Sequence, residues 1–133
     1  MYRRDLLTAE IQKLAQALAR IMGLKNEGKE EEADQNLENT LENEFGIFYS
    51  DLIAYNQEDF LAFLTKKDFS PEKLDIFSQL LYLKFNPNEP TAEGKSIAEK
   101  LTTIYQILEM KHHVINMINL GRQKSAKQHL RLY

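Results

Sequence analysis

Cysteine is absent from the 133-residue chain, which excludes disulfides, thiolate metal ligands and a cysteine nucleophile together. Tryptophan is absent as well, and three prolines and five glycines leave little material for the many turns of an all-β fold. No apolar run approaches the roughly 20 residues that span a bilayer. Polar residues also interrupt the apolar pattern at the N-terminus, unlike the core of a signal peptide. We therefore expect a helical, soluble, cytoplasmic protein without a membrane partner.

Length and composition are those of an ordinary globular domain. Hydrophobic residues make up 43% and charged residues 28%, which predicts a single domain over residues 1–133 with its own core. The net charge of -3 hides an uneven distribution. Between Glu27 and Glu44 there are eight acids and one base, whereas from Lys111 onwards there are five Lys or Arg and no acid. Such a chain favours self-association through opposite fields, and two solvated helix faces are the alternative.

The first 46 residues have the pattern of two helices joined by a short turn. An apolar stripe with spacings of four and three predicts a helix from about Arg3 or Asp5 to about Asn26. Gly28 offers a left-handed stop, and three glutamates then favour a new helix start, at Glu30. Gly46 ends this second helix. The two apolar sets are Leu7, Ile11, Leu14, Leu18 and Ile21, followed by Ala33, Leu37, Leu41 and Phe45.

The middle of the chain is aromatic, because all seven phenylalanines lie between Phe45 and Phe85. Asn56 followed by acids predicts an N-cap and a short helix. Ser70 followed by Pro71 is a clearer helix start, with a capping side chain and proline at the first helical position. We expect these aromatic side chains to contribute to the core.

Residues 86–90, with the sequence "NPNEP", predict a loop because proline removes a backbone donor and restricts the residue before it. Beyond this loop the apolar spacing predicts one long helix from about Ala92 to Leu120. Gly121 is then expected to break the chain before a last helix over Ser125–Tyr133. No segment shows the alternation and flanking turns of a strand.

The turn segments at the two ends of the chain share a pattern. In each, glycine is followed by alanine five residues later and by leucine four residues after that. This pattern resembles the second half of a tetratricopeptide repeat, with its turn glycine, small residue and large apolar residue. "YRRD" followed by "EGKEEEA" is also loosely similar to a small family of uncharacterised bacterial all-helical proteins. The residues that carry the repeat pattern are Gly28, Ala33 and Leu37, and Gly121, Ala126 and Leu130.

The resemblance implies antiparallel hairpins at both ends of the chain and a groove lined by the first helix of each. Partner contacts would then come from Lys25 and Asn26 in one hairpin and from Lys111 and Asn119 in the other. The resemblance implies no catalytic residues.

The residues that could carry chemistry do not form a recognisable catalytic or metal-binding pattern. His112 and His113 point about 100° apart on a helix and cannot chelate one ion. Glu109 and His112 have the Glu-x-x-His spacing of di-iron bundles, but the second pair that such a site needs is missing. The serines have no nucleophile-elbow context, and no glycine-rich phosphate loop is present. We expect no metal, no cofactor and no enzymatic activity.

The basic C-terminal segment is too short a patch on an acidic protein to favour nucleic acid. The sequence therefore predicts a compact all-α domain of about six or seven helices, acting as a protein–protein adaptor or a self-associating protein. The alternative is a helical protein that binds a small apolar ligand. Whether the aromatic middle is solid core or encloses a cavity is left open, and the residues that would line a cavity are Phe48, Phe60, Phe63, Phe77 and Tyr105.

Overall fold

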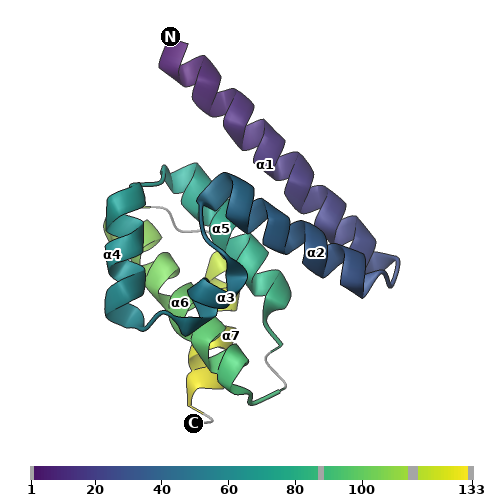
Figure 1. Cartoon of the computed structure of the whole chain (residues 1–133). Helices are drawn as coiled ribbons and strands as arrows, with labels where there is room; N and C mark the ends of the chain where they lie inside the picture. Colours follow the sequence, from purple (N-terminus) through teal and green to yellow (C-terminus); the bar gives the residue numbers. More distant parts are fainter. Residues whose placement is uncertain (1, 87–88, 114–116, 132–133) are drawn as a thin grey trace. The chain divides into compact units, whose positions relative to one another are not determined.

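The computed structural model describes residues 2–86, 89–113 and 117–131. These residues form seven α-helices and one π-helical turn, and no strand occurs among them, so the all-α prediction is confirmed (Figure 1). The chain divides into two compact units, Met1–Tyr49 and Ser50–Tyr133, called here the N-terminal unit and the C-terminal unit. The prediction of one domain stays a prediction. None of the described helices combines the length and the apolar character needed to cross a bilayer.

The N-terminal unit is a helical hairpin made of α1 (Tyr2–Asn26), α2 (Glu30–Thr40) and the π-helical turn η1 (Leu41–Phe45). The turn lies where the sequence predicted it, since Gly28 has a positive φ of 79°. Burial follows the two predicted apolar sets only in part, because Leu7 at the start of the first stripe is 37% exposed. The buried side chains of the hairpin are Leu14, Leu18, Ile21, Ala33, Leu37, Leu41 and Phe45.

The end of the second helix differs from a regular α-helix. Residues 41–45 widen into a π-turn, in which the N–H of Gly46 donates to the carbonyl of Leu41. The N–H of Ile47 donates to the same carbonyl at 3.2 Å. This turn keeps both Leu41 and Phe45 buried. Gly46 ends the helix as predicted, in the left-handed conformation.

The C-terminal unit is built around α6 (Ala92–Met110), which packs against α4 (Gln57–Lys67), α5 (Pro71–Lys84) and α7 (Met117–Leu130). A short helix, α3 (Tyr49–Ala54), begins at the boundary between the units. The predicted caps are confirmed: Asn56 accepts a hydrogen bond from the backbone of Asp59, and Ser70 accepts one from Lys73. In the predicted loop over 86–90, residues 87 and 88 lie outside the described part of the chain.

The prediction of one helix from Ala92 to Leu120, broken at Gly121, is wrong. Helix α6 ends at Met110, and His113 adopts the left-handed conformation with φ 57°. Gly121 lies inside α7, which begins at Met117 rather than Ser125. Histidine tolerates this conformation better than most residues, and the positive side chain of Lys111 suits a helix C-terminus. Residues 114–116, and 132–133 of the predicted last helix, lie outside the described part of the chain.

Helices α6 and α7 pack together, so helices pair at both ends of the chain. The contact depends on a close approach at Gly94, because a Cβ on this residue would stand 3.0 Å from Nε2 of His129. The ring of His129 also packs edge-on against Phe85, with 5.0 Å between ring centroids. The likeness of the two helix pairs to tetratricopeptide repeats stays a prediction.

The aromatic core of the C-terminal unit is centred on Phe77, which is fully buried. Its ring lies 6.2 Å from that of Phe60, 6.4 Å from Phe63 and 6.0 Å from Phe69. Edge-to-face and tilted pairs of this kind add to the stabilisation from burial alone. The phenylalanine-rich middle of the sequence therefore joins α4 and α5 to each other.

Candidate functional site

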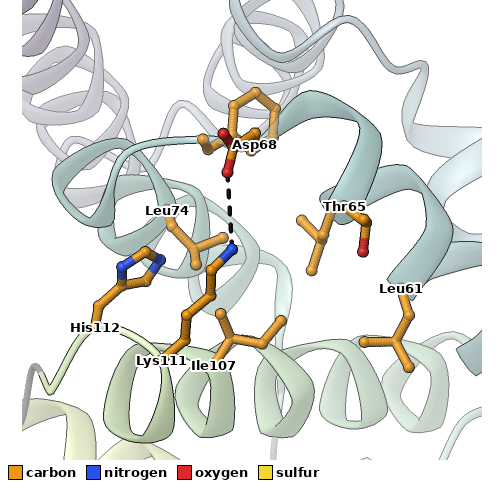
Figure 2. Close-up of a pocket in the computed structure, with 9 residues that line it drawn as sticks. Leu61, Thr65, Asp68, Leu74, Ile107, Lys111 and His112 are labelled. Carbon is orange, nitrogen blue, oxygen red and sulfur yellow. Dashed lines mark ion pairs between the residues drawn. The ribbon is translucent and has the colours of Figure 1, made fainter.

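A half-open groove lies in the C-terminal unit where the link between α4 and α5 meets the end of α6. It has a volume of about 190 Å³. Figure 2 shows Leu61 and Thr65 from α4, Leu74 from α5, Ile107 from α6 and Lys111 just after the end of α6 around the same space. We call it the α4–α6 groove. Its lining residues are Leu61, Leu64, Thr65, Asp68, Phe69, Leu74, Ile107, Lys111 and His112.

Two helix ends shape the groove. Asp68 ends α4 in the left-handed conformation with φ 48°, and its N–H donates to the carbonyl of Leu64 at 2.9 Å. Ser70 begins α5 two residues later, so the link is very short and holds Phe69 half-buried between the helices. The Lys73 ammonium lies 5.1 Å from the centre of the Phe69 ring. On the other side, α6 stops at Met110 and places Lys111 at the mouth.

The floor of the groove is apolar, whereas its rim carries both signs of charge. Nζ of Lys111 lies 3.7 Å from Oδ1 of Asp68 across the mouth (Figure 2). The two side chains are 63% and 80% exposed, so this pair contributes about 0–1 kcal/mol to stability. Both charges are therefore free to exchange this contact for one with a ligand. His112 adds a half-buried imidazole to the same rim.

The four predicted partner contacts are divided between the two units. Lys111 lines the α4–α6 groove. Asn119 is only 8% exposed, and its amide donates to Oδ1 of Asp75 at 2.7 Å, which ties α7 to α5. Lys25 and Asn26 lie at the end of α1 in the N-terminal unit. The structure thus places Lys111 at the α4–α6 groove.

The residues predicted to line an apolar cavity are also divided. Phe60, Phe77 and Tyr105 are buried, and the rings of Phe60, Phe63 and Phe77 pack on one another. Phe48 is 55% exposed and belongs to the N-terminal unit. Phe60, Phe63 and Phe77 therefore belong to the packed core described above, and Phe48 does not.

Sequence reasoning missed most of the groove. Its floor includes Phe69 and Leu74, and the rim includes Asp68. The sequence does contain a signal for the short link that shapes the groove. Lys66 and Lys67, which are typical of a helix end, stand only four and three residues before Ser70, where the next helix starts. A link that short must fold tightly, which leaves its side chains at the junction of two helix ends.

A buried serine–lysine pair on α6 was also missed. Nζ of Lys100 donates to Oγ of Ser96 and to the carbonyl of Tyr55, both at 2.8 Å, and the Ser96 hydroxyl donates to the carbonyl of Ile53 at 2.8 Å. Burial lowers the pKa of Lys100 from 10.5, with the nearby Glu99 acting in the opposite direction. The serine proton points to a backbone carbonyl and not to a base. This pair satisfies carbonyls at the end of α3, which is a structural role.

The polar contacts between α5, α6 and α7 include one hydroxyl without a partner. Within the described residues Oη of Tyr105 has no hydrogen-bond partner, although it lies near the Ser78 hydroxyl, which itself donates to the carbonyl of Asp75 at 2.6 Å. Burial raises the pKa of Tyr105 to about 12, while Ser78 and Arg122 act to lower it. The Arg122 guanidinium stacks 4.8 Å from the Tyr82 ring. These side chains pack α7 against α5 and α6, which is a structural role.

The rest of the described chain adds no metal centre: no group of three or more His, Asp or Glu side chains gathers there. Comparison of the chain with protein-family models, curated proteins and solved structures gives no match. The α4–α6 groove is therefore the candidate functional site.

Proposed function

We propose that the protein is a non-enzymatic interaction module of the cytoplasm that holds a side chain of a protein partner in the α4–α6 groove. The observation that carries this proposal is an apolar floor open to solvent inside a rim with both signs of charge. Interfaces gain most of their affinity from a few apolar or aromatic anchors set in pockets and surrounded by polar residues. The groove has this composition.

Its size favours a protein side chain over a whole small molecule. Drug-sized ligands occupy pockets of about 300–1,000 Å³, whereas the groove has a volume of about 190 Å³. A cavity of about 150 Å³ accommodates a benzene ring. One large apolar side chain of a partner therefore fills the groove.

The rim suggests how the partner is oriented. Lys111 and Asp68 are held together weakly, so an acidic group on the partner binds Lys111 and a basic group binds Asp68. Rim charges of this kind act on association rate and register more than on affinity. The expected partner segment carries one large apolar residue flanked by charges.

The experiment uses a random peptide library displayed on phage and selected against the whole chain. Selected peptides are titrated into 15N-labelled protein, and we expect the largest backbone shifts at Thr65, Asp68 and Lys111. Leu61→Arg places a charge at the mouth and should weaken binding by about tenfold or more. Leu6→Arg is the matched control, since Leu6 is an exposed leucine of the N-terminal unit. Peptides that bind Leu61→Arg and the native chain equally well would show that the groove is not the binding site.

A further inference from the structure

Helix α7 carries an unpartnered basic face. Leu120, Lys124, Lys127 and Arg131 follow one another at spacings of four, three and four residues, so they share one side of the helix. All four are exposed, while Asn119, Gln123, Ala126 and His129 are buried on the other side. Within the described residues, the three cations make no ion pair. A shallow hollow of about 290 Å³ runs along this face, which we call the basic face of α7.

The helix that follows the first turn of the chain has a solvent face with the same spacing and the opposite charge. Glu31, Gln35, Glu38 and Glu42 also follow at four, three and four residues. They lie opposite the side that buries Ala33 and Leu37. Glu31 and Glu42 are exposed and make no ion pair in the described part of the chain. We call this the acidic face of α2; its last residue, Glu42, lies in the π-helical turn η1 that continues the helix.

We propose that the protein self-associates by docking the basic face of α7 in one copy onto the acidic face of α2 in a second copy. The two faces present charges of opposite sign in the same register, and the twelve residues of each face extend over about 16 Å, or three helical turns. A spacing of four, three and four reads the same in both directions, so parallel and antiparallel docking each align two pairs of opposite charge. The exposed Leu120 adds apolar area to the contact.

A second copy fits the basic face better than a nucleic acid does. Three cations can neutralise three phosphates, so the logarithm of the binding constant would fall with the logarithm of the salt concentration with a slope of only about -3. The lining of the face contains no aromatic side chain on which a base could stack. The remainder of the chain is acidic and repels phosphate, since the net charge of the whole is -3. The same acids attract the basic face of another copy.

The test is analytical ultracentrifugation of the whole chain at low and physiological ionic strength, where charges are screened over roughly 30 Å and 8 Å. We expect dimers or larger species at low ionic strength, with a dissociation constant that rises about tenfold or more at the higher one. Lys124→Glu with Arg131→Glu should abolish association. Arg20→Glu with Lys66→Glu changes the net charge equally on residues outside both faces, and should leave association intact.

A charge swap makes the test specific for the two faces. Glu31→Lys with Glu42→Lys should also abolish association, and adding Arg131→Glu to these two reversals should restore it. In either docking direction position 131 then faces position 31 or 42 with the opposite charge, while Glu38 still faces Lys124 or Lys127. Circular dichroism checks that each variant keeps its helix content. A native chain that stays monomeric at low ionic strength overturns the proposal, as does association that survives the reversals. A monomer that binds a DNA duplex through Lys124 and Arg131 would assign the basic face to nucleic acid instead.

This inference does not depend on the α4–α6 groove. Leu61→Arg leaves both charged faces unchanged. Lys124→Glu changes no residue that lines the groove. Peptide binding and sedimentation therefore report separately on the proposed function and on self-association.

Discussion

The two units of the chain are held together by different kinds of side chain. The N-terminal unit closes on aliphatic residues of two helices, with Phe45 as its buried phenylalanine, and keeps its charges outside. The C-terminal unit packs aromatic rings around Phe77 and buries polar groups among them, including Lys100 and Tyr105. The larger aromatic core stabilises the C-terminal unit more strongly. The buried titratable groups make the free energy of unfolding of this unit depend on pH. We therefore expect core substitutions and alkaline pH to affect the two units differently.

The largest effect is expected from Phe77→Ala in the aromatic core. The ring is fully buried and contacts three other phenylalanine rings, so its removal should cost about 4 kcal/mol of the free energy of unfolding. Hydrogen exchange followed by NMR should show the loss in amides of α4, α5 and α6. Phe48→Ala is the control, because this ring is mostly exposed and its loss should cost no more than about 0.5 kcal/mol.

Leu37→Ala tests the aliphatic hairpin in the same way. Leu37 is 1% exposed, and deletion of its side chain should cost about 3 kcal/mol. We expect faster exchange in amides of α1 and α2, with the amides of α5 and α6 keeping their protection. If protection falls equally throughout the chain, the two units unfold together and residues 1–133 behave as the single domain that the sequence predicted.

Alkaline pH should affect the C-terminal unit through Tyr105. Its folded pKa of about 12 lies above the ordinary value of 10.0, so above pH 10 the unfolded chain releases the proton first. Stability therefore falls between about pH 10 and pH 12, by roughly 3 kcal/mol in total. Tyr105→Phe should remove this loss and change stability little at pH 7, since the hydroxyl has no hydrogen-bond partner among the described residues.

The comparison with the variant is needed because Lys100 acts in the opposite direction. Its folded pKa is lowered from 10.5, so the folded chain releases this proton first and stability from this group rises with pH until 10.5. We would measure the free energy of unfolding by urea titration at a series of pH values from 8 upwards, on the native chain and on Tyr105→Phe. The difference between the two chains gives the contribution of Tyr105. An unchanged alkaline loss in Tyr105→Phe contradicts the assignment. Tyr55→Phe, at a half-buried tyrosine outside the surroundings of Tyr105, should leave the loss intact.

The sequence predicts the helices well where local chemistry decides and less well where a helix ends without a strong signal. The caps at Asn56 and Ser70 and the turn at Gly28 are local, and all three are found. The ends at Asp68 and His113 use non-glycine residues in the left-handed conformation, and an apolar spacing that continues past His113 hides the second of them. The groove depends on the meeting of these two ends, so it could not be read from spacing along one helix.

The smallest effect distinguishes the two glycines that the sequence had made equivalent. Gly28 has φ 79° in the turn, whereas Gly121 lies inside α7, and an added Cβ meets no atom within 4 Å at either position. Gly28→Ala should therefore destabilise the N-terminal unit by about 1 kcal/mol through backbone strain alone. Gly121→Ala should stabilise the C-terminal unit by about 0.5–1 kcal/mol, because alanine favours the helix. Thermal denaturation measures both changes, and opposite signs confirm that only one of the two glycines forms a turn. Destabilisation by both substitutions would indicate a turn at Gly121 as well and support the repeat that the sequence suggested.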